Sequence, residues 1–381
     1  MRRVFFLVAL CSTSACMQSA GLGGDQCAAR PVDSSRELLV VDDSVLSPSG
    51  VAPTTLPWSP AHLMTLPGED AYSSAWVGRG LEHWRDASQD AGQAEVAAVL
   101  DSRVLCPWLR SEPKNGCDDS CVTCQARSYS LALAPFRTIA VANRLDLGLL
   151  PDARTEAGEG RVVLGFVPAE AETAPPVQLT LIFEFALDGE VGGWAKRWHA
   201  LGDRGSDFSA LANVVDGFVS LRRLRDGAPA LSQVRANLIV DGQVSELREL
   251  GLGVDGELAP RALRNTPRLD LDGSPELVTL VQQQASRIQQ GTQLVPKALL
   301  ALSAEGGAHD WSLPGVDAET RREFDRGTCA GCHANAGLDG FHVSPLGAGS
   351  ARVSRFLSDP AAEDDELRRR ARGLDTALCE P

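Results

Sequence analysis

The sequence predicts an α+β fold: a large mixed α/β N-terminal region with antiparallel strands, followed by a small, mostly helical and loop-rich C-terminal region. Three observations predict it. Residues 177–187 place an apolar side chain at every second position, which is typical of a half-buried strand. Asp241-Gly242 separates two apolar runs, as in a hairpin between antiparallel strands. Residues 274–291 and 317–326 carry helical patterns instead.

The first third of the chain mixes short helices with irregular segments. We expect a mature N-terminal arm over 16–60, with a short strand at 37–41. Apolar residues recur at helical spacing over 73–86 and 93–102, which predicts two helices. The Cys-rich stretch 106–124 has no hydrophobic period and many turn residues, so it is predicted to be a loop.

The strands follow in the middle of the chain. Residues 136–141 and 161–167 are short, β-branched runs bounded by Gly and Pro. A polar trio, Asn143, Arg144 and Asp146, directly follows the first of these runs. A polar trio at a strand end can be a ligand site, but the interpretation we favour is a turn whose polar groups satisfy one another.

Helical patterns return towards the C-terminus. We expect helices over 193–201 and 208–224, then a helix over 274–291 with Ser as N-cap, Pro in the first turn and Gly at the end. Gly306-Gly307 marks an expected boundary. The last predicted element is a polar helix over 359–374, acidic near its start and basic nearer its end.

The N-terminus has the pattern of a secretory signal peptide over residues 1–15. Two arginines precede an apolar run over 4–10 that is too short to span a bilayer, and small residues then lead to Cys16. Cleavage before Cys16 would resemble the processing of a bacterial lipoprotein, although Thr13 stands where that motif usually has Leu. We therefore expect an exported protein, either in the periplasm or anchored to the membrane through lipidated Cys16.

Length and charge limit the classes of partner. The 381 residues suffice for two domains, or for one large domain with an appendage. The formal net charge of −14 argues against nucleic acid and anionic membrane surfaces as partners.

Export changes the meaning of the ten cysteines. Two belong to the leader and two to the motif at 329–333, which leaves six: Cys27, Cys106, Cys117, Cys121, Cys124 and Cys379. In an oxidising compartment six cysteines fit up to three disulfides, whose pairing the sequence does not decide. The four cysteines between 106 and 124 could instead hold a zinc ion.

Residues 329–333 read Cys-Ala-Gly-Cys-His, the pattern of covalent haem attachment. On one helical turn Cys329 and Cys332 project to neighbouring points, so each thiol can add to one haem vinyl group. His333 then lies under the ring, where an imidazole nitrogen can bind the iron. The sequence therefore predicts one covalently bound haem c, with Cys329 and Cys332 as attachment residues and His333 as an axial iron ligand.

The segment from Arg322 to Pro345 resembles c-type cytochromes. It is also similar to a group of large exported bacterial proteins that join an uncharacterised α+β region to a C-terminal stretch of this kind. Those proteins have a Phe-His-x-x-Pro-like segment downstream, here residues 341–345. We expect an α+β domain of unknown role over 61–305 and a haem-attachment region over 306–381.

The second axial ligand is the open question. A small cytochrome c usually supplies a methionine, but all three methionines of this chain precede the motif. Three alternatives follow: two histidine ligands, an open axial position, or no haem. His342, nine residues past His333, is the main candidate for the second ligand, with a surface loop histidine as its other interpretation. His309 and His199 are weaker candidates.

These observations favour an exported, mono-haem c-type cytochrome-like protein that transfers electrons to a redox partner protein in the cell envelope. One alternative is a haem oxidoreductase with an open distal site. Another is a haem-free binding or structural protein in which Cys329 and Cys332 form a disulfide or help His333 hold a metal. We expect an electron carrier or binding protein rather than an enzyme, and no catalytic residue is predicted. No Ser-His-Asp or metal-hydrolase spacing stands out, which argues against a hydrolase.

Overall fold

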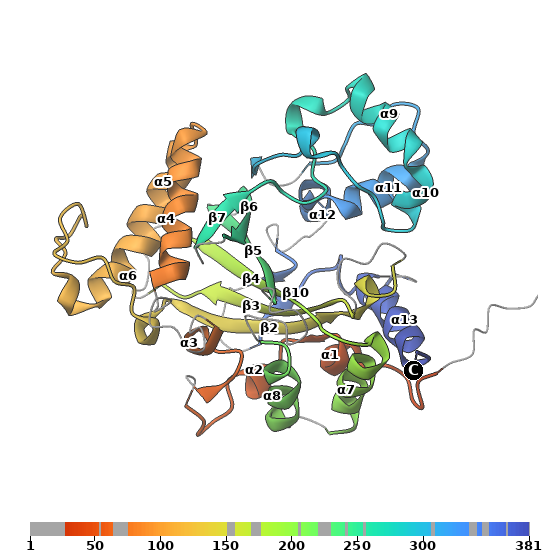
Figure 1. Cartoon of the computed structure of the whole chain (residues 1–381), viewed down its shortest axis with the longest axis horizontal. Helices are drawn as coiled ribbons and strands as arrows, with labels where there is room; N and C mark the ends of the chain where they lie inside the picture. Colours follow the sequence, from red (N-terminus) through yellow and green to blue (C-terminus); the bar gives the residue numbers. More distant parts are fainter. Residues whose placement is uncertain are drawn as a thin grey trace, which may run out of the picture.

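The computed structural model has the α+β fold that the sequence predicts, with an antiparallel sheet at its centre and helices on both sides (Figure 1). It describes residues 27–52, 55–63, 75–150, 157–168, 177–204, 207–219, 230–240, 243–253, 257–305, 309–334, 341–344, 350–362 and 365–380. The predicted signal peptide, Cys16 and the predicted turn at Asp241-Gly242 lie outside these residues. Within them, no helix has the length and apolar character needed to cross a membrane.

The sheet is an antiparallel meander in the order β1 to β7, with β8 also paired to β6. Its strands are β1 (Leu39–Val40), β2 (Phe136–Arg144), β3 (Glu159–Phe166), β4 (Gln178–Ala186), β5 (Leu231–Val240), β6 (Gln243–Leu252), β7 (Leu258–Arg261) and β8 (Ala304–Glu305). The strands predicted over 136–141, 161–167 and 177–187 are confirmed as β2, β3 and β4. β5 and β6 pair directly across the predicted hairpin.

One face of the sheet is mostly apolar and the other carries most of the charged side chains of the central strands, because successive side chains of a strand point to opposite faces. On β4, Phe183 belongs to the main hydrophobic core, while its neighbour Glu184 points the other way. The register places Arg161 of β3 opposite Glu184, and Arg235 of β5 opposite Glu249 of β6. A row of alternating arginines and glutamates therefore crosses the central strands on the charged face.

The apolar face is covered by helices from the N-terminal two thirds of the chain. They are α1 (Ser34–Glu37), α2 (Asp43–Leu46), α3 (Pro60–Leu63), α4 (Ala75–Asp90), α5 (Ala94–Val99), a π-helical turn (Leu100–Leu105), α6 (Cys106–Ser111), α7 (Val191–Asp203) and α8 (Phe208–Asp216). Aromatic side chains anchor them: Trp76 of α4 meets Phe183 edge-on at 6.2 Å, and Trp198 of α7 stacks on Phe218 at 6.4 Å. Short 3₁₀ turns cover Pro113–Asn115, Leu131–Leu133, Leu145–Leu147, Leu269–Leu271 and Lys297–Leu299.

A smaller helical lobe lies above the sheet in Figure 1. It contains α9 (Pro275–Gln283), α10 (Ala285–Gln289), α11 (Ala318–Gly327) and α12 (Cys329–Ala334). A second hydrophobic cluster fills it, in which Trp311 meets Phe324 edge-on at 6.1 Å. This cluster draws side chains from both sides of Gly306-Gly307.

The single helix expected over 274–291 is divided into α9 and α10. Its ends are as predicted, since the Ser274 hydroxyl accepts a hydrogen bond from the Leu277 N–H, and Gly291 has a φ of +70°. The break falls at Gln284, whose side-chain amide donates to the Leu294 carbonyl at 2.7 Å and accepts from the Leu294 N–H at 2.9 Å. These two hydrogen bonds to the backbone of Leu294 accompany the departure of Gln284 from helical geometry.

After the lobe, the chain returns to the sheet. β9 (Val343–Ser344) pairs with β10 (Arg352–Val353), and α13 (Glu366–Leu378) packs against α7. The helix predicted over 359–374 begins later because Asp365 is its N-cap, accepting a hydrogen bond from the Arg368 N–H at 2.7 Å.

The six remaining cysteines form three disulfides, as the sequence allows. Cys106–Cys121 and Cys117–Cys124 join parts of the Cys-rich segment, which begins with α6 rather than as a loop. Cys27–Cys379 ties the start of the described chain to the end of α13. The sulfurs of Cys117, Cys121 and Cys124 lie within 4.8 Å of one another, but each is engaged in a disulfide.

Candidate functional site

The pentapeptide 329–333 is presented from a well-braced helix. α12 follows α11 after one residue, Thr328, whose buried hydroxyl donates to the Asp325 carbonyl at 3.0 Å. The same oxygen accepts from the Gly331 N–H at 3.1 Å and from the Trp311 indole N–H at 3.0 Å. One hydroxyl therefore joins α11, α12 and the core of the lobe, which fixes the direction in which the motif side chains point.

Two further contacts fix the position of α12. A Cβ on Gly331 would lie 2.7 Å from the Cα and carbonyl oxygen of Asp325, so the close approach of α12 to α11 depends on glycine. The Cys329 N–H donates to the Thr266 hydroxyl at 2.9 Å, which joins α12 to the segment after β7.

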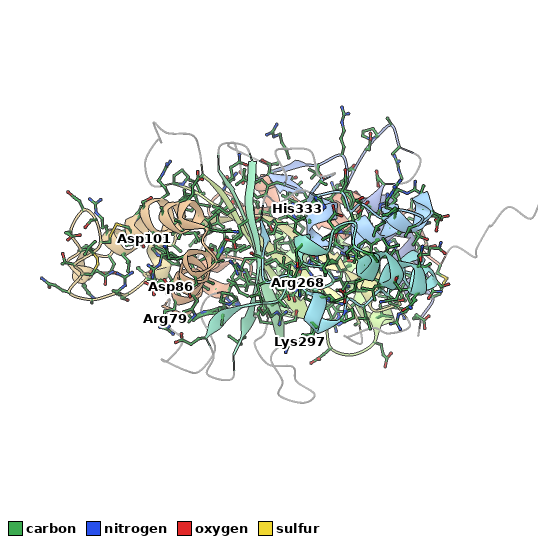
Figure 2. All side chains as sticks on the ribbon, turned by 90° about the horizontal axis from the view of Figure 1, so that it is seen from above. Arg79, Asp86, Asp101, Arg268, Lys297 and His333 are labelled. Atoms are coloured by element: carbon green, nitrogen blue, oxygen red, sulfur yellow. A yellow bond between two sulfur atoms is a disulfide. The ribbon has the colours of Figure 1, made fainter. Side chains whose placement is uncertain are left out.

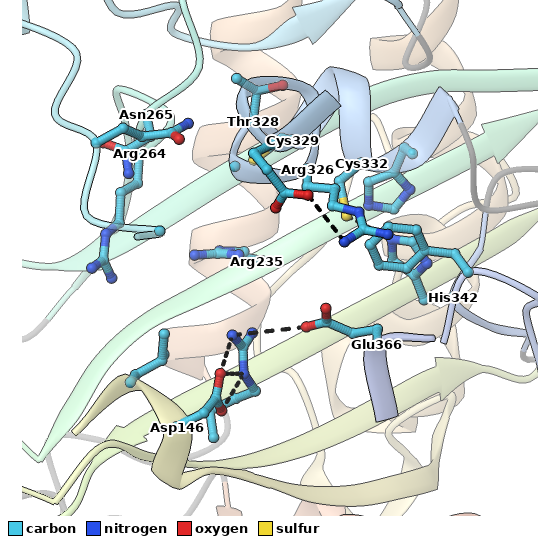
Figure 3. Close-up of a pocket in the computed structure, with 18 of the residues that line it drawn as sticks. Asp146, Arg235, Arg264, Asn265, Arg326, Thr328, Cys329, Cys332, His342 and Glu366 are labelled. Atoms are coloured by element: carbon cyan, nitrogen blue, oxygen red, sulfur yellow. Dashed lines mark hydrogen bonds and ion pairs between the residues drawn. The ribbon is translucent and has the colours of Figure 1, made fainter. Parts of the chain in front are cut away.

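Both motif cysteines open onto a cavity of about 270 Å³ between α12 and the charged face of the sheet (Figure 3). The four residues that the sequence proposed, Cys329, Cys332, His333 and His342, all line it. Part of its wall is apolar and includes Leu147, Leu150, Ile182, Leu247, Leu263 and Phe356. The volume lies near the lower end of the roughly 300–1,000 Å³ of small-molecule sites.

His333 and His342 lie side by side in the wall of this cavity. The ring centroids of His333 and His342 are 4.8 Å apart, with a 45° angle between the ring planes. The His342 Nε2 atom lies 3.2 Å from the Cys332 sulfur, and its Nδ1 atom lies 3.3 Å from the Ser354 hydroxyl. Phe356 packs against the same ring at 4.8 Å. His342 is thus held at a cavity wall, not on the surface loop that was its alternative interpretation.

Burial governs the ionisation of these side chains. Burial raises the pKa of the Cys332 thiol to about 12, and the negative charge of Glu366 adds to the effect. Burial also raises the pKa of Cys329, although Arg235 opposes it. The pKa of His342 lies well below its usual range because of burial and the neighbouring His333. Both sulfurs are therefore thiols at neutral pH. Thiol–disulfide exchange needs a thiolate, so this environment disfavours that reaction.

The floor of the cavity is an arginine-rich surface that the sequence reasoning missed. Eight arginines line the cavity, against three carboxylates: Arg144, Arg161, Arg235, Arg248, Arg264, Arg326, Arg369 and Arg370, with Asp146, Glu323 and Glu366. The signal that could have found the floor was present in the strands. Polar or charged residues recur at every second position along much of β4 and β5, which predicts a second face that is not apolar.

Ion pairs hold this floor together. Glu366 of α13 pairs with Arg369 at 2.7 Å and with Arg370 at 3.0 Å. Burial alone would raise the pKa of Glu366, but the charges of Arg370 and Arg144 outweigh it and lower the pKa to about 2. Burial also acts to raise the pKa of Glu159, but the charge of Arg161 outweighs it and lowers the pKa to about 2. These carboxylates are therefore ionised throughout the physiological range.

The polar trio after β2 belongs to this site in part. Arg144 and Asp146 pair at 2.9 Å, as a self-satisfied turn requires, and both also line the cavity. Arg144 reaches Glu366 at 4.0 Å, which links the end of β2 to α13. Asn143 points away from the cavity and donates to the Glu37 carbonyl. The predicted self-satisfied turn therefore accounts for the Arg144–Asp146 ion pair, but it does not predict that this pair lines the cavity.

The two weaker histidine candidates lie elsewhere. The Nδ1 atom of His199 lies 2.7 Å from a carboxylate oxygen of Glu37 beneath the sheet. His309 lies 3.2 Å from Asp272 and packs on Trp311. Neither lines the cavity. Figure 2 shows His333 well removed from Asp101 and the α4–α5 end of the molecule, where the Cys-rich segment lies.

Comparisons of the chain with protein families, with curated proteins and with solved structures found no match.

Proposed function

We propose that the protein is an exported, mono-haem c-type cytochrome-like protein of the cell envelope that transfers electrons to a redox partner protein. One haem c would be attached through Cys329 and Cys332, with His333 as an iron ligand. The observation that carries this proposal is the state of the cysteines. Six described cysteines are paired in disulfides, while Cys329 and Cys332 alone among the described cysteines are free and open onto one cavity.

The four side chains are not gathered around one point in the way that the ligands of a single metal ion are. Ligands of one zinc ion lie about 2.0–2.3 Å from it and therefore close to one another. Among the described residues, no three ligand atoms drawn from Cys329, Cys332, His333 and His342 come within 4.8 Å of one another. The adjoining apolar wall suits the hydrocarbon surface of a macrocycle.

Both histidines would hold the iron. The ring centroids of His333 and His342 lie 4.8 Å apart, which brings two imidazoles to the same part of the cavity wall. We therefore assign His342 as the second iron ligand beside His333.

Each side chain then has a separate task. The bound haem supplies one-electron redox chemistry. Cys329 and Cys332 would hold it, His333 and His342 would ligate the iron, and the apolar wall would exclude water. The three disulfides support the expected export, since disulfides persist in oxidising compartments. A lipidated Cys16 would anchor the protein at the membrane.

A haem-free metal site is the second candidate. The 3.2 Å between the Cys332 sulfur and His342 Nε2 approaches the separation of two ligands on one ion. In this alternative the same two side chains, helped by His333, would bind zinc and not haem.

Haem staining of a denaturing gel separates the two candidates. The full chain is expressed with and without the periplasmic haem-attachment machinery, and metal content is measured on the same samples. We expect a haem-stained band only with the machinery, and its loss in the Cys329→Ser, Cys332→Ser variant. Ala334→Ser, directly after the motif, is the matched control and should retain the band. An unstained protein that carries one zinc per chain would overturn the haem proposal in favour of the second candidate.

A further inference from the structure

Arg235 is a half-buried cation on the cavity floor that makes only long ion pairs with the carboxylates around it. It lies in the middle of β5, paired with Ile182 of β4 and Glu249 of β6, and its guanidinium projects into the cavity below Cys329 (Figure 3). Its Nε atom is buried without a hydrogen-bond partner. Its ion pairs to Glu184 and Glu249 are 3.6 and 3.8 Å long, beyond the 2.7–3.2 Å of an N–H···O hydrogen bond.

The two glutamates nearest to Arg235 are engaged by closer partners. Glu184 accepts from the Gln233 side-chain amide at 2.5 Å and pairs with Arg161 at 3.1 Å. Glu249 pairs with Arg261 at 2.7 Å and also accepts a backbone N–H. Both carboxylates therefore have partners closer than Arg235, although the Oε1 atom of Glu184 is buried without a hydrogen bond of its own. The Arg235 side chain is 26% exposed, but its buried Nε–H is left without an acceptor, which is costly unless another group satisfies it.

The charge around the cavity points the same way. The chain as a whole carries −14, yet the lining has eight arginines and three carboxylates. Most of these arginines have a carboxylate of the protein within hydrogen-bond distance, for example Arg144 with Asp146 at 2.9 Å. Arg235 is the exception at the centre, and apolar side chains such as Ile182 and Leu247 flank it. The environment suits an anionic group carried on an apolar body.

We propose that Arg235 anchors a carboxylate-binding site on the floor of the cavity, which accepts a carboxylate carried on an apolar body. The planar guanidinium fork matches a carboxylate with two parallel hydrogen bonds. Two sources have this chemistry. A haem propionate is the first, and in that case the site rests on the proposed function. A free organic acid that enters the cavity without haem is the second.

Calorimetric titration of the haem-free full chain distinguishes the sources. The protein is made without the attachment machinery and titrated with haemin, with haemin dimethyl ester and with benzoate. If the source is a propionate, we expect haemin to bind roughly 10- to 100-fold more tightly than the ester, and Arg235→Met to abolish that preference. If the source is a free acid, benzoate binds and Arg235→Met removes its binding.

Two further variants keep the test decisive. Arg235→Lys retains the charge but loses the fork, so it should weaken carboxylate binding even if Arg235→Met does not fold. Arg268→Met is the matched control, because Arg268 is exposed, pairs with Asp270 and lies outside the cavity (Figure 2). Equal binding of haemin and its ester together with no binding of benzoate would overturn the proposal.

Failure of this proposal and failure of the haem proposal are distinguishable. Covalent haem on the gel with no effect of either Arg235 variant removes the carboxylate site alone. Benzoate binding that depends on Arg235 in a chain that never takes up haem removes the haem proposal alone.

Discussion

Replacing Gly331 with alanine tests whether backbone contact fixes the position of the motif helix. The added Cβ would lie 2.7 Å from the Cα and carbonyl oxygen of Asp325 and 2.9 Å from its Cβ. Ordinary carbon contacts are about 3.5–4.0 Å, so the overlap is close to 1 Å. Because two of these atoms are backbone, no side-chain rotation relieves it. α12 must move away from α11, and the cysteines and His333 must move with it.

The size of the effect follows from two opposing terms. Overpacking of this kind costs about 1–3 kcal/mol. Alanine gains up to about 1 kcal/mol over glycine in a helix. We therefore expect Gly331→Ala to lower the free energy of unfolding by up to ~2 kcal/mol. Gly193→Ala in α7 is the matched control, since a Cβ there meets nothing within 4 Å and should only stabilise.

Urea unfolding of the two variants measures this difference. With equal slopes, a lower midpoint for Gly331→Ala and an unchanged or higher midpoint for Gly193→Ala is the expected result. The haem-stained band should weaken only in Gly331→Ala, because the thiols are displaced. Equal stabilisation by the two alanines would refute the claim that α12 depends on a close backbone approach.

Three other predictions rest on separate contacts. In haem-loaded protein, His342→Ala should open the iron, so that carbon monoxide changes the spectrum of the reduced variant but not of the wild type; identical spectra would remove His342 as a ligand. The double variant Cys27→Ser, Cys379→Ser opens a cross-link that spans 352 residues. In the chain-entropy model it should lower the free energy of unfolding by up to about 6 kcal/mol, against ~2.5 kcal/mol for opening the 7-residue cross-link Cys117–Cys124. Glu366→Gln should lower the free energy of unfolding by about 3 kcal/mol at pH 7 and by almost nothing below pH ~2. The lowered pKa of Glu366 means that its contribution is present above pH ~4.5 and is lost as the pH falls to about 2, which unfolding at several pH values measures.

The sequence was sufficient for most of the fold because local rules decide those elements. The period-two pattern of β4 and the Ser274 cap of α9 are properties of short windows, and both are observed. The break at Gln284 is different. It depends on a hydrogen-bonded clamp to Leu294, ten residues away, which no helical pattern over 274–291 contains.

The same distinction between local and distant contacts separates the parts of the site that the sequence predicts from those that it does not. The motif at 329–333 and His342 are close in sequence, so spacing alone proposed them, and they do line one cavity. The arginine floor comes from strands that are far from the motif in sequence, and only the sheet register brings Arg235 under Cys329. A charged residue in a strand predicts exposure to water by default, so a covered charged face is invisible until the lobe that covers it is known.

The arginine-rich floor also bears on how the proposed haem-attachment region, residues 306–381, relates to the rest of the chain. The cavity next to the motif is not built from that region alone, since β2, β5 and β6 supply its base and α13 one wall. If haem binds as proposed, the sheet would cover the macrocycle and meet its charged groups. The large N-terminal region would then be part of the haem site itself, and not a separate module joined to it.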